Sequence, residues 1–245
     1  MKTLSVVIPF LNEERTICKT LEEIIAVDLS RLGYEKEIIL VNDGSTDDSQ
    51  SVIQKFLQKS YPDNTIQYIE NDKNHGKWYS LKEWFRIATW DLFIVQDADS
   101  EYNPHDYLPL IEKLEKDNLD FVYGSRIAWI KKFKNNYSTA SFLLGWLAVS
   151  FLTSLLTFKR VSDEPTCYKL YTSKLRKYLL LPPEPRFEWE PAITMLLLRK
   201  WFTYGEVPIH YTARKVAEGK KIKWKDGVKA ITTLFRWRFK RLSWK

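Results

Sequence analysis

Short runs of β-branched and other apolar residues alternate with helix-like segments through the first half of the chain. Strand-like runs occupy residues 4–9, 37–41, 66–70, 92–96 and 121–123. Helices are predicted between them, at residues 12–27, 46–59, 77–89 and 104–116, the first with Asn12 as its N-cap. Strands and helices that alternate at this spacing build right-handed βαβ units, so we expect an α/β fold with a mainly parallel sheet and flanking helices.

Length and composition favour a folded chain with a large core. The chain has 245 residues, of which 44% are hydrophobic and 28% are charged, too apolar a mixture for disorder. Its two cysteines, Cys18 and Cys167, are too few for a disulfide framework and match no metal-ligand spacing, so we expect a reducing compartment. No basic segment followed by an apolar run opens the sequence, and we therefore do not expect secretion.

Polar clusters follow three of the predicted strands. Asn12, Asp43 and the acidic run that begins at Asp97 each come shortly after a strand-like segment. In parallel sheets ligands bind beyond the carboxyl ends of the strands, so these clusters are predicted to line one binding edge. The phosphate-binding motifs G-x-G-x-x-G and G-x-x-x-x-G-K-[ST] are absent, which argues against a dinucleotide oxidoreductase and a P-loop nucleotidase.

The acidic run Asp97-Ala98-Asp99-Ser100-Glu101 follows an apolar strand and precedes a turn. Carboxylates at alternate positions just past a strand can project together. Their hard oxygens suit Mg²⁺ or Mn²⁺, with phosphate oxygens completing the shell of the ion. A solvated acidic turn is the alternative, but the position at the ligand edge of a parallel sheet favours a metal site.

Five motifs occur in an order that is typical of one enzyme family. They are V-V-I-P-F-L-N-E-E at 6–14, V-N-D-G-S-T-D at 41–47, G-K at 76–77, Q-D-A-D at 96–99 and Y-G-S-R at 123–126. Together they resemble the GT-A fold glycosyltransferases of family 2. The later runs E-V-P-I at 206–209 and E-G-K-K-I at 218–222, with Arg214 between them, resemble the dolichyl-phosphate mannose synthase branch. Two positions depart from the pattern: Asn42 replaces a usual aspartate, and Trp78 stands where a glycine commonly follows Gly-Lys, which would reshape the pocket near the sugar.

The resemblance implies a role for each candidate site residue. It implies a nucleotide-sugar site formed by Pro9, Leu11, Glu13, Asp43, Lys77 and Asp97, and a Mg²⁺ or Mn²⁺ site formed by Asp97, Asp99 and Glu101. It implies an acceptor-phosphate site formed by Arg126, Arg214 and Lys221, and a catalytic set of Asp99, Arg126, Asp163 and Arg214. From the residues alone, the alternatives are turn or capping roles for Asp43 and Asp163, surface ion pairs for the arginines and solvated cations for the lysines.

No side chain stands out as a catalytic base. His75, His105 and His210 have neither triad nor metal spacing, so we assign them no catalytic role. A sugar-hydroxyl acceptor would need a carboxylate to remove its proton, and Asp163 or Glu188 would have to serve. A lipid phosphate, with a second pKa of about 6, is already a nucleophile at neutral pH and needs only cations to hold it.

Two features of the second half indicate a membrane surface. Residues 142–158 are almost wholly apolar, but as a helix they would span only about 25 Å, short for a hydrocarbon core of about 30 Å. Ser150, Thr153, Ser154 and Thr157 form a weakly polar stripe, so a helix on a membrane surface and a helix packed on the protein's own core are the alternatives.

The basic C-terminal part decides between two kinds of partner. Residues 199–245 carry a net charge of +11 against −4 for the rest of the chain. Residues 230–244 interleave aromatic and basic side chains, which is typical of a membrane interface and also of single-stranded nucleic-acid binding. Because the apolar segment has no use in a nucleic-acid-binding protein, we expect a membrane partner and no nucleic acid.

These features predict a GT-A glycosyltransferase domain over residues 1–215, with a membrane-contacting helical insertion at 127–160, followed by a basic amphipathic segment over 216–245. The predicted reaction is metal-dependent transfer of a hexose, with inversion, from a nucleotide diphosphate sugar to a polyprenyl (dolichyl-type) phosphate. We expect a peripheral or monotopic protein on the cytoplasmic side of a membrane. Transfer to a glycan hydroxyl, or a non-catalytic module that binds membrane or nucleic acid, are the alternatives.

Overall fold

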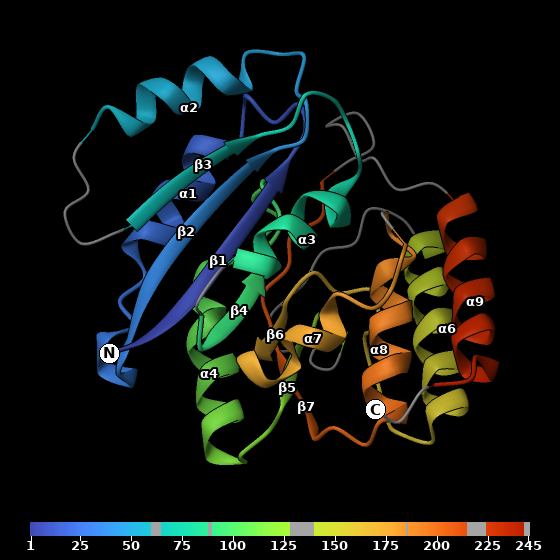
Figure 1. The fold of residues 1–245 in the computed structure, drawn as a ribbon. Helices are drawn as coiled ribbons and strands as arrows, with labels where there is room; N and C mark the ends of the chain where they lie inside the picture. The colour runs from blue at the N-terminus through green and yellow to red at the C-terminus, as the bar shows by residue number, and fades with distance from the viewer. Residues whose placement is uncertain (60–64, 88–89, 128–139, 185, 215–223, 243–245) are drawn as a thin grey trace.

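A seven-stranded sheet forms the centre of the computed structural model, which describes residues 1–59, 65–87, 90–127, 140–184, 186–214 and 224–242 (Figure 1). The strands are β1 (Lys2–Phe10), β2 (Tyr34–Asn42), β3 (Thr65–Glu70), β4 (Leu92–Val95), β5 (Phe121–Ser125), β6 (Lys169–Thr172) and β7 (Tyr204–Pro208). Their order is β3-β2-β1-β4-β6-β5-β7, in which β6 runs antiparallel to β4 and β5 and the other pairs are parallel. The prediction of a mainly parallel sheet in an α/β fold is confirmed.

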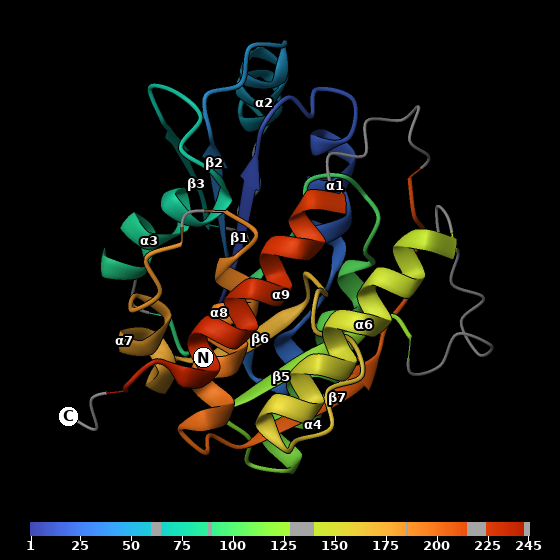
Figure 2. The same cartoon turned by 90° about the vertical axis from the view of Figure 1, so that its right-hand side faces the viewer.

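Helices lie on both faces of this sheet. They are α1 (Ile17–Ala26), α2 (Ser49–Leu57), α3 (Lys77–Ile87), α4 (Tyr107–Lys116), α6 (Ala140–Thr157), α7 (Arg176–Leu179), α8 (Trp189–Arg199) and α9 (Trp224–Phe239), with 3-10 turns at Ser30–Leu32, Pro104–Asp106 and Ser173–Leu175. Figure 2 shows α1 and α3 on opposite sides of the sheet. The helices α6, α8 and α9 pack against one another at one side of the molecule (Figure 1).

The first helix begins later than the sequence predicts. It starts at Ile17, and Asn12 is not its N-cap. Asn12 takes a left-handed backbone conformation (φ 55°), and its Oδ1 accepts a hydrogen bond of 2.8 Å from the Thr46 N–H. The side chain therefore links the loop after β1 to the loop after β2, and this tertiary contact replaces the predicted local cap. The second helix also starts late, at Ser49.

The predicted apolar helix is α6, and its polar stripe faces inward. Ser150, Thr153 and Thr157 are buried, and their hydroxyls donate at 2.7–2.9 Å to carbonyls four residues earlier. The exposed positions are Leu144, Gly145, Leu147, Ala148, Phe151 and Leu155. The helix thus packs on the protein, as one alternative had it, and presents an apolar face outward. Within the described ranges, no helix is both long and apolar enough to span a bilayer.

The basic C-terminal helix is part of the folded body. Leu234 and Trp237 of α9 are buried, and the helix packs against α6 and α8. The Trp237 indole N–H donates to Glu184 at 3.0 Å, and the Arg199 guanidinium donates to the Trp237 carbonyl. Residues 215–223 and 243–245, which include part of the predicted basic segment, lie outside the described residues. The predicted boundary at residue 215 stays a prediction.

Candidate active site

The ends of β1, β2 and β4 bring the predicted polar clusters to one edge of the sheet. Phe10 pairs with Asn42 and Val7 pairs with Val95, so the segments that follow these three strands start side by side. The register places Asp43 and the acidic run at the same edge, as the sequence predicts. Pro9 is buried within β1, and Leu11 is half-buried just beyond its end.

Asp43 has both carboxylate oxygens hydrogen-bonded within the protein. Its Oδ1 accepts at 3.0 Å from the Asn71 side-chain amide, the His75 N–H and the Ser80 hydroxyl, and its Oδ2 accepts at 2.9 Å from the Gly76 N–H. These bonds fix the loop that leads from β3 into α3. A structural role is therefore evident for Asp43, and its contact with a nucleoside stays a prediction.

Arg214 joins three carboxylates that come from two other segments. Its guanidinium donates to Glu13 at 3.1 Å and to Asp99 at 2.7 Å, and its Nε lies 3.7 Å from Glu101 Oε1. Glu101 also accepts hydrogen bonds from the Tyr211 hydroxyl and the Arg214 N–H, at 2.8 and 2.7 Å. Glu101 thus anchors the segment that carries the arginine. The fold brings together four predicted site residues that are distant in the sequence.

The acidic run creates an unusual electrostatic setting for Asp99. Burial, together with the negative charges of Asp97 and Glu101, raises the pKa of the Asp99 carboxyl to about 7, although the Arg214 guanidinium opposes the shift. Burial would also raise the pKa of Asp97, but the Lys77 ammonium, 2.7 Å away, holds it below its usual value. The carboxylates of the acidic run would therefore stabilise a further positive charge bound beside Asp99.

The acidic run suits a divalent cation by its chemistry. Among the residues that the structure describes, no three His, Cys, Asp or Glu side chains are gathered as a ready metal site. The Lys77 ammonium contacts Asp97 instead, and the Arg214 guanidinium contacts Asp99. Carboxylate oxygens are nevertheless the ligands that Mg²⁺ and Mn²⁺ prefer, and such an ion would offset the burial and the repulsion that together raise the Asp99 pKa. The ligand set Asp97, Asp99 and Glu101 fits the ion in this sense and stays a prediction.

A second arginine forms a buried ion pair. The Nε, Nη2 and backbone N–H of Arg126 all donate to the Asp163 carboxylate at 2.8 Å. The guanidinium also stacks on Trp146, with its central carbon 3.8 Å from the ring centroid. Neither a surface ion pair for Arg126 nor a capping role for Asp163 describes this arrangement. Lys221, the third predicted phosphate ligand, lies outside the described residues.

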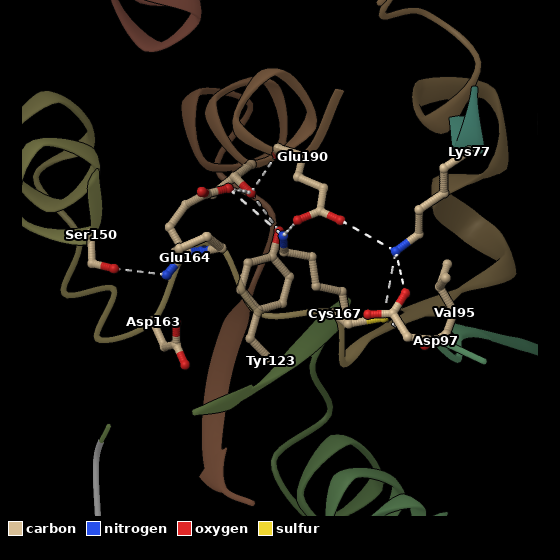
Figure 3. A network of polar contacts seen from close by, with 12 residues as sticks. Lys77, Val95, Asp97, Tyr123, Ser150, Asp163, Glu164, Cys167 and Glu190 are labelled. Carbon is tan, nitrogen blue, oxygen red and sulfur yellow. Dashed lines mark hydrogen bonds and ion pairs between the residues drawn. The ribbon is translucent and has the colours of Figure 1, made fainter. Parts of the chain in front are cut away.

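Three buried charged residues near Lys77 were missed by the sequence analysis. Glu164, Lys169 and Glu190 form a polar network behind the acidic run (Figure 3). A charged residue within an apolar stretch of sequence can indicate a buried ion pair. The sequence does not show which residues pair, because the partners come from distant segments. Trp78, the departure from the family pattern, is buried and stacks on Trp189 with ring centroids 3.5 Å apart.

Two curated relatives with similar sequences have a lipid phosphate in their names. The UDP-N-acetylglucosamine–dolichyl-phosphate N-acetylglucosaminyltransferase of Methanococcus voltae is 27% identical over 237 residues, which are 90% of this chain and 91% of that protein. The undecaprenyl-phosphate 4-deoxy-4-formamido-L-arabinose transferase of Photorhabdus laumondii is 35% identical over 128 residues, which are 52% of this chain and 38% of that protein. The chain thus spans about half or less of the length of some curated relatives that it matches.

A solved structure matches the fold of the chain, and a family profile matches its sequence. The glucosyl-3-phosphoglycerate synthase from Mycobacterium tuberculosis, solved with Mn²⁺, uridine diphosphate and phosphoglyceric acid, superposes with a TM-score of 0.67 at 16% identity, over 99% of this chain and 80% of that one. This likeness confirms the predicted GT-A-like fold. Residues 5–179, more than half of the chain, match the profile of the family described as Glycosyl transferase family 2. The chain belongs to glycosyl transferase family 2, as the order of its motifs predicts.

Proposed function

We propose that the protein transfers a hexose from a nucleotide diphosphate sugar to the phosphate of a polyprenyl, dolichyl-type phosphate. The observation that carries this proposal is the set of cations Lys77, Arg126 and Arg214, each paired with a carboxylate at or near the sheet edge. Arginine guanidinium groups bind phosphate oxygens in bidentate fashion, and a lysine ammonium binds them as a point charge. Both proposed substrates carry phosphate. The names of the Methanococcus voltae and Photorhabdus laumondii relatives include dolichyl phosphate and undecaprenyl phosphate, which supports this acceptor class.

The two carboxylates considered as a base both have cationic partners. Asp163 is 0% exposed and bound by Arg126, and Glu188 lies 3.3 Å from the Lys229 ammonium. A hydroxyl acceptor needs a base within hydrogen-bond reach, whereas a phosphate dianion has no proton to lose. The pairing of these carboxylates therefore favours the phosphate acceptor over a glycan hydroxyl.

The proposed reaction breaks the bond between the anomeric carbon and the donor phosphate, and forms a bond to an oxygen of the acceptor phosphate. We assign donor binding to Pro9, Leu11, Glu13, Asp43, Lys77 and Asp97, and acceptor-phosphate binding to Arg126, Arg214 and Lys221. Bound Mg²⁺ or Mn²⁺, held by Asp97, Asp99 and Glu101, would supply positive charge for the departing nucleoside diphosphate. Asp163 orients Arg126. Attack in line, opposite the leaving group, gives inversion.

A screen of nucleotide sugars tests donor binding. Ligands that bind the native state raise its melting temperature, so the donor should stabilise the protein when Mn²⁺ is present. Stabilisation by one sugar nucleotide, and not by the free sugar, would identify the donor. A flat response to all nucleotide sugars would count against the proposed donor site.

Exchanging Arg214 for lysine should impair catalysis strongly. A lysine carries one point charge and cannot reproduce the fork that contacts Glu13 and Asp99 together. Arg214→Lys is expected to lower transfer to polyprenyl phosphate by on the order of a hundredfold, with nucleotide binding retained. The control is Arg31→Lys, which changes an exposed arginine paired with Glu112. Full activity in Arg214→Lys would make Arg214 an ordinary ion-pair residue.

We further propose that the protein binds the cytoplasmic surface of a membrane through α6 and α9. The exposed face of α6 is apolar, and Leu144, Phe151 and Leu155 are 67%, 67% and 55% exposed. The neighbouring helix α9 exposes Lys225, Lys229 and Arg236. An apolar face beside basic side chains is typical of interfacial helices.

Polar substitutions on α6 test this membrane contact. The triple variant Leu144→Ser, Phe151→Ser, Leu155→Ser is expected to sediment much less with vesicles that contain anionic lipid, because it removes apolar surface available for insertion. The fold should survive, since these side chains face outward. Leu181→Ser, which removes an exposed leucine from another segment, is the control. Equal vesicle binding by the triple variant would exclude α6 as the anchor.

A further inference from the structure

A chain of alternating charges runs from the acidic run into the interior. The Lys77 ammonium lies 2.7 Å from Asp97 and 3.8 Å from Glu190 Oε1. The other oxygen of Glu190 lies 3.1 Å from the Lys169 ammonium, which lies 3.8 Å from Glu164. Figure 3 shows Glu190 between the two ends of this chain. Glu190 is therefore the carboxylate that contacts both lysines.

The stack of Trp78 on Trp189 sets the distance between Lys77 and Glu190. Lys77 precedes Trp78 on α3, and Glu190 follows Trp189 on α8. The two indole rings stack at 3.5 Å with an interplanar angle of 17°, and both side chains are buried. Because the stack fixes the first turn of α3 against the first turn of α8, the neighbouring ammonium and carboxylate are held at a defined separation.

Within the described part of the chain, Lys77 has few other partners for its charge. Besides Asp97 and Glu190, its ammonium lies 3.7 Å from the sulfur of Cys167. The Lys77 side chain is only 20% exposed, and an ammonium so far removed from water requires compensating negative charge. Asp97 has other roles when substrates bind, because it is also a proposed ligand of the cation and of the donor. When Asp97 binds either of them, Glu190 is the carboxylate that still holds the Lys77 ammonium at the sheet edge.

We propose that Glu190 is a positioning residue for the donor site: its carboxylate holds the Lys77 ammonium beside Asp97, where the ammonium meets the diphosphate of the nucleotide sugar. The donor part of this inference rests on the proposed function. The placement of Lys77 by Glu190 can be tested without turnover.

The test compares Glu190→Gln with Glu184→Gln. Both changes keep the side-chain shape and remove a buried carboxylate, and the Glu184 carboxylate instead holds Trp237 of α9. The first readout is acetylation of Lys77 by acetic anhydride, followed by peptide mass spectrometry. Loss of a neighbouring carboxylate lowers the pKa of Lys77, and each unit raises the reactive free-amine fraction about tenfold. Faster labelling of Lys77 is expected in Glu190→Gln only.

The second readout separates positioning from stability. Glu190→Gln is expected to raise the KM for the nucleotide sugar by about tenfold with a smaller change in kcat, since Lys77 contacts the donor in ground and transition states alike. In the double variant with Lys169→Met, the buried lysine that has lost its 3.1 Å partner is gone, and Glu164, whose pKa burial raises, stays neutral without its cation. The melting temperature should therefore recover while the raised KM and the faster Lys77 labelling remain.

Two results would overturn the assignment of Glu190. One is wild-type labelling of Lys77 and wild-type KM in Glu190→Gln. The other is recovery of labelling, KM and melting temperature together in the double variant, which would give Glu190 a purely structural role through Lys169. Faster Lys77 labelling in a protein that transfers no sugar to any acceptor would support the positioning role and reject the proposed function.

Discussion

Asp99→Asn is expected to abolish turnover and to leave the fold intact. The substitution removes a charged oxygen ligand from the proposed metal site and breaks the 2.7 Å contact with the Arg214 guanidinium. Loss of one preorganised electrostatic group costs on the order of a hundredfold or more in rate. The measurement is the initial rate of sugar transfer at saturating Mn²⁺.

The melting temperature of Asp99→Asn should rise relative to that of the wild type as the pH increases. An acid whose pKa is raised by folding makes the folded state less stable as pH increases from its unfolded pKa to its folded pKa. For Asp99 this interval runs from 3.8 to about 7. Asparagine does not ionise, so the variant is not destabilised over this pH interval. Its melting temperature should therefore equal or exceed that of the wild type above pH 7.

The matched control is Asp117→Asn, which changes an exposed carboxylate paired with Lys113. It should leave both rate and melting temperature near the wild-type values. Unchanged transfer in Asp99→Asn would contradict the metal-site assignment. A collapse of its melting temperature at all pH values would make Asp99 a structural residue.

Asp163→Asn is expected to cause the largest loss of stability. The Arg126 guanidinium and the Asp163 carboxylate are both buried, and the substitution leaves the arginine without its counter-charge. Breaking a buried pair in this way costs about 3–5 kcal/mol. For a chain of this length the melting temperature should fall by about 10 °C, measured by circular dichroism.

A double variant checks that the lost charge is the cause. Asp163→Asn combined with Arg126→Met removes both charges and should recover most of the melting temperature without recovering transfer. Glu115→Gln, which breaks the exposed pair with Lys2, should cost less than about 1 kcal/mol. Equal effects of Asp163→Asn and Glu115→Gln would show that the buried pair contributes little to folding.

The first half of the fold is predictable because its signals are local. The runs that form β1, β2 and β4 are buried, and their continuous apolar residues identify them as inner strands of a parallel sheet. By contrast, β6 has four residues and includes the buried Lys169, and its antiparallel direction depends on its neighbours. The helix α8 is buried almost all round, so it shows no amphipathic period.

The residues of the candidate site can be chosen from the sequence, but their contacts cannot. The D-x-D run and the later arginines can be found because their spacing and order are encoded along the chain. The pairing of Arg126 with Asp163, and of Arg214 with Glu13, joins segments that only the sheet brings together. Asn12 shows the same limit: its capping pattern is local, whereas its bond to the Thr46 amide is tertiary.

Transfer of labelled sugar to a defined acceptor is the decisive experiment for the proposed reaction. The purified protein, with Mn²⁺ and the nucleotide sugar that stabilises it, is incubated in detergent with a polyprenyl phosphate or with the corresponding polyprenol. We expect label to enter the lipid fraction only with the phosphate, as a product sensitive to mild acid, and we expect the Asp99→Asn variant to form none. Transfer to the polyprenol or to a glycan, or release of free sugar with no lipid product, would contradict the proposed reaction.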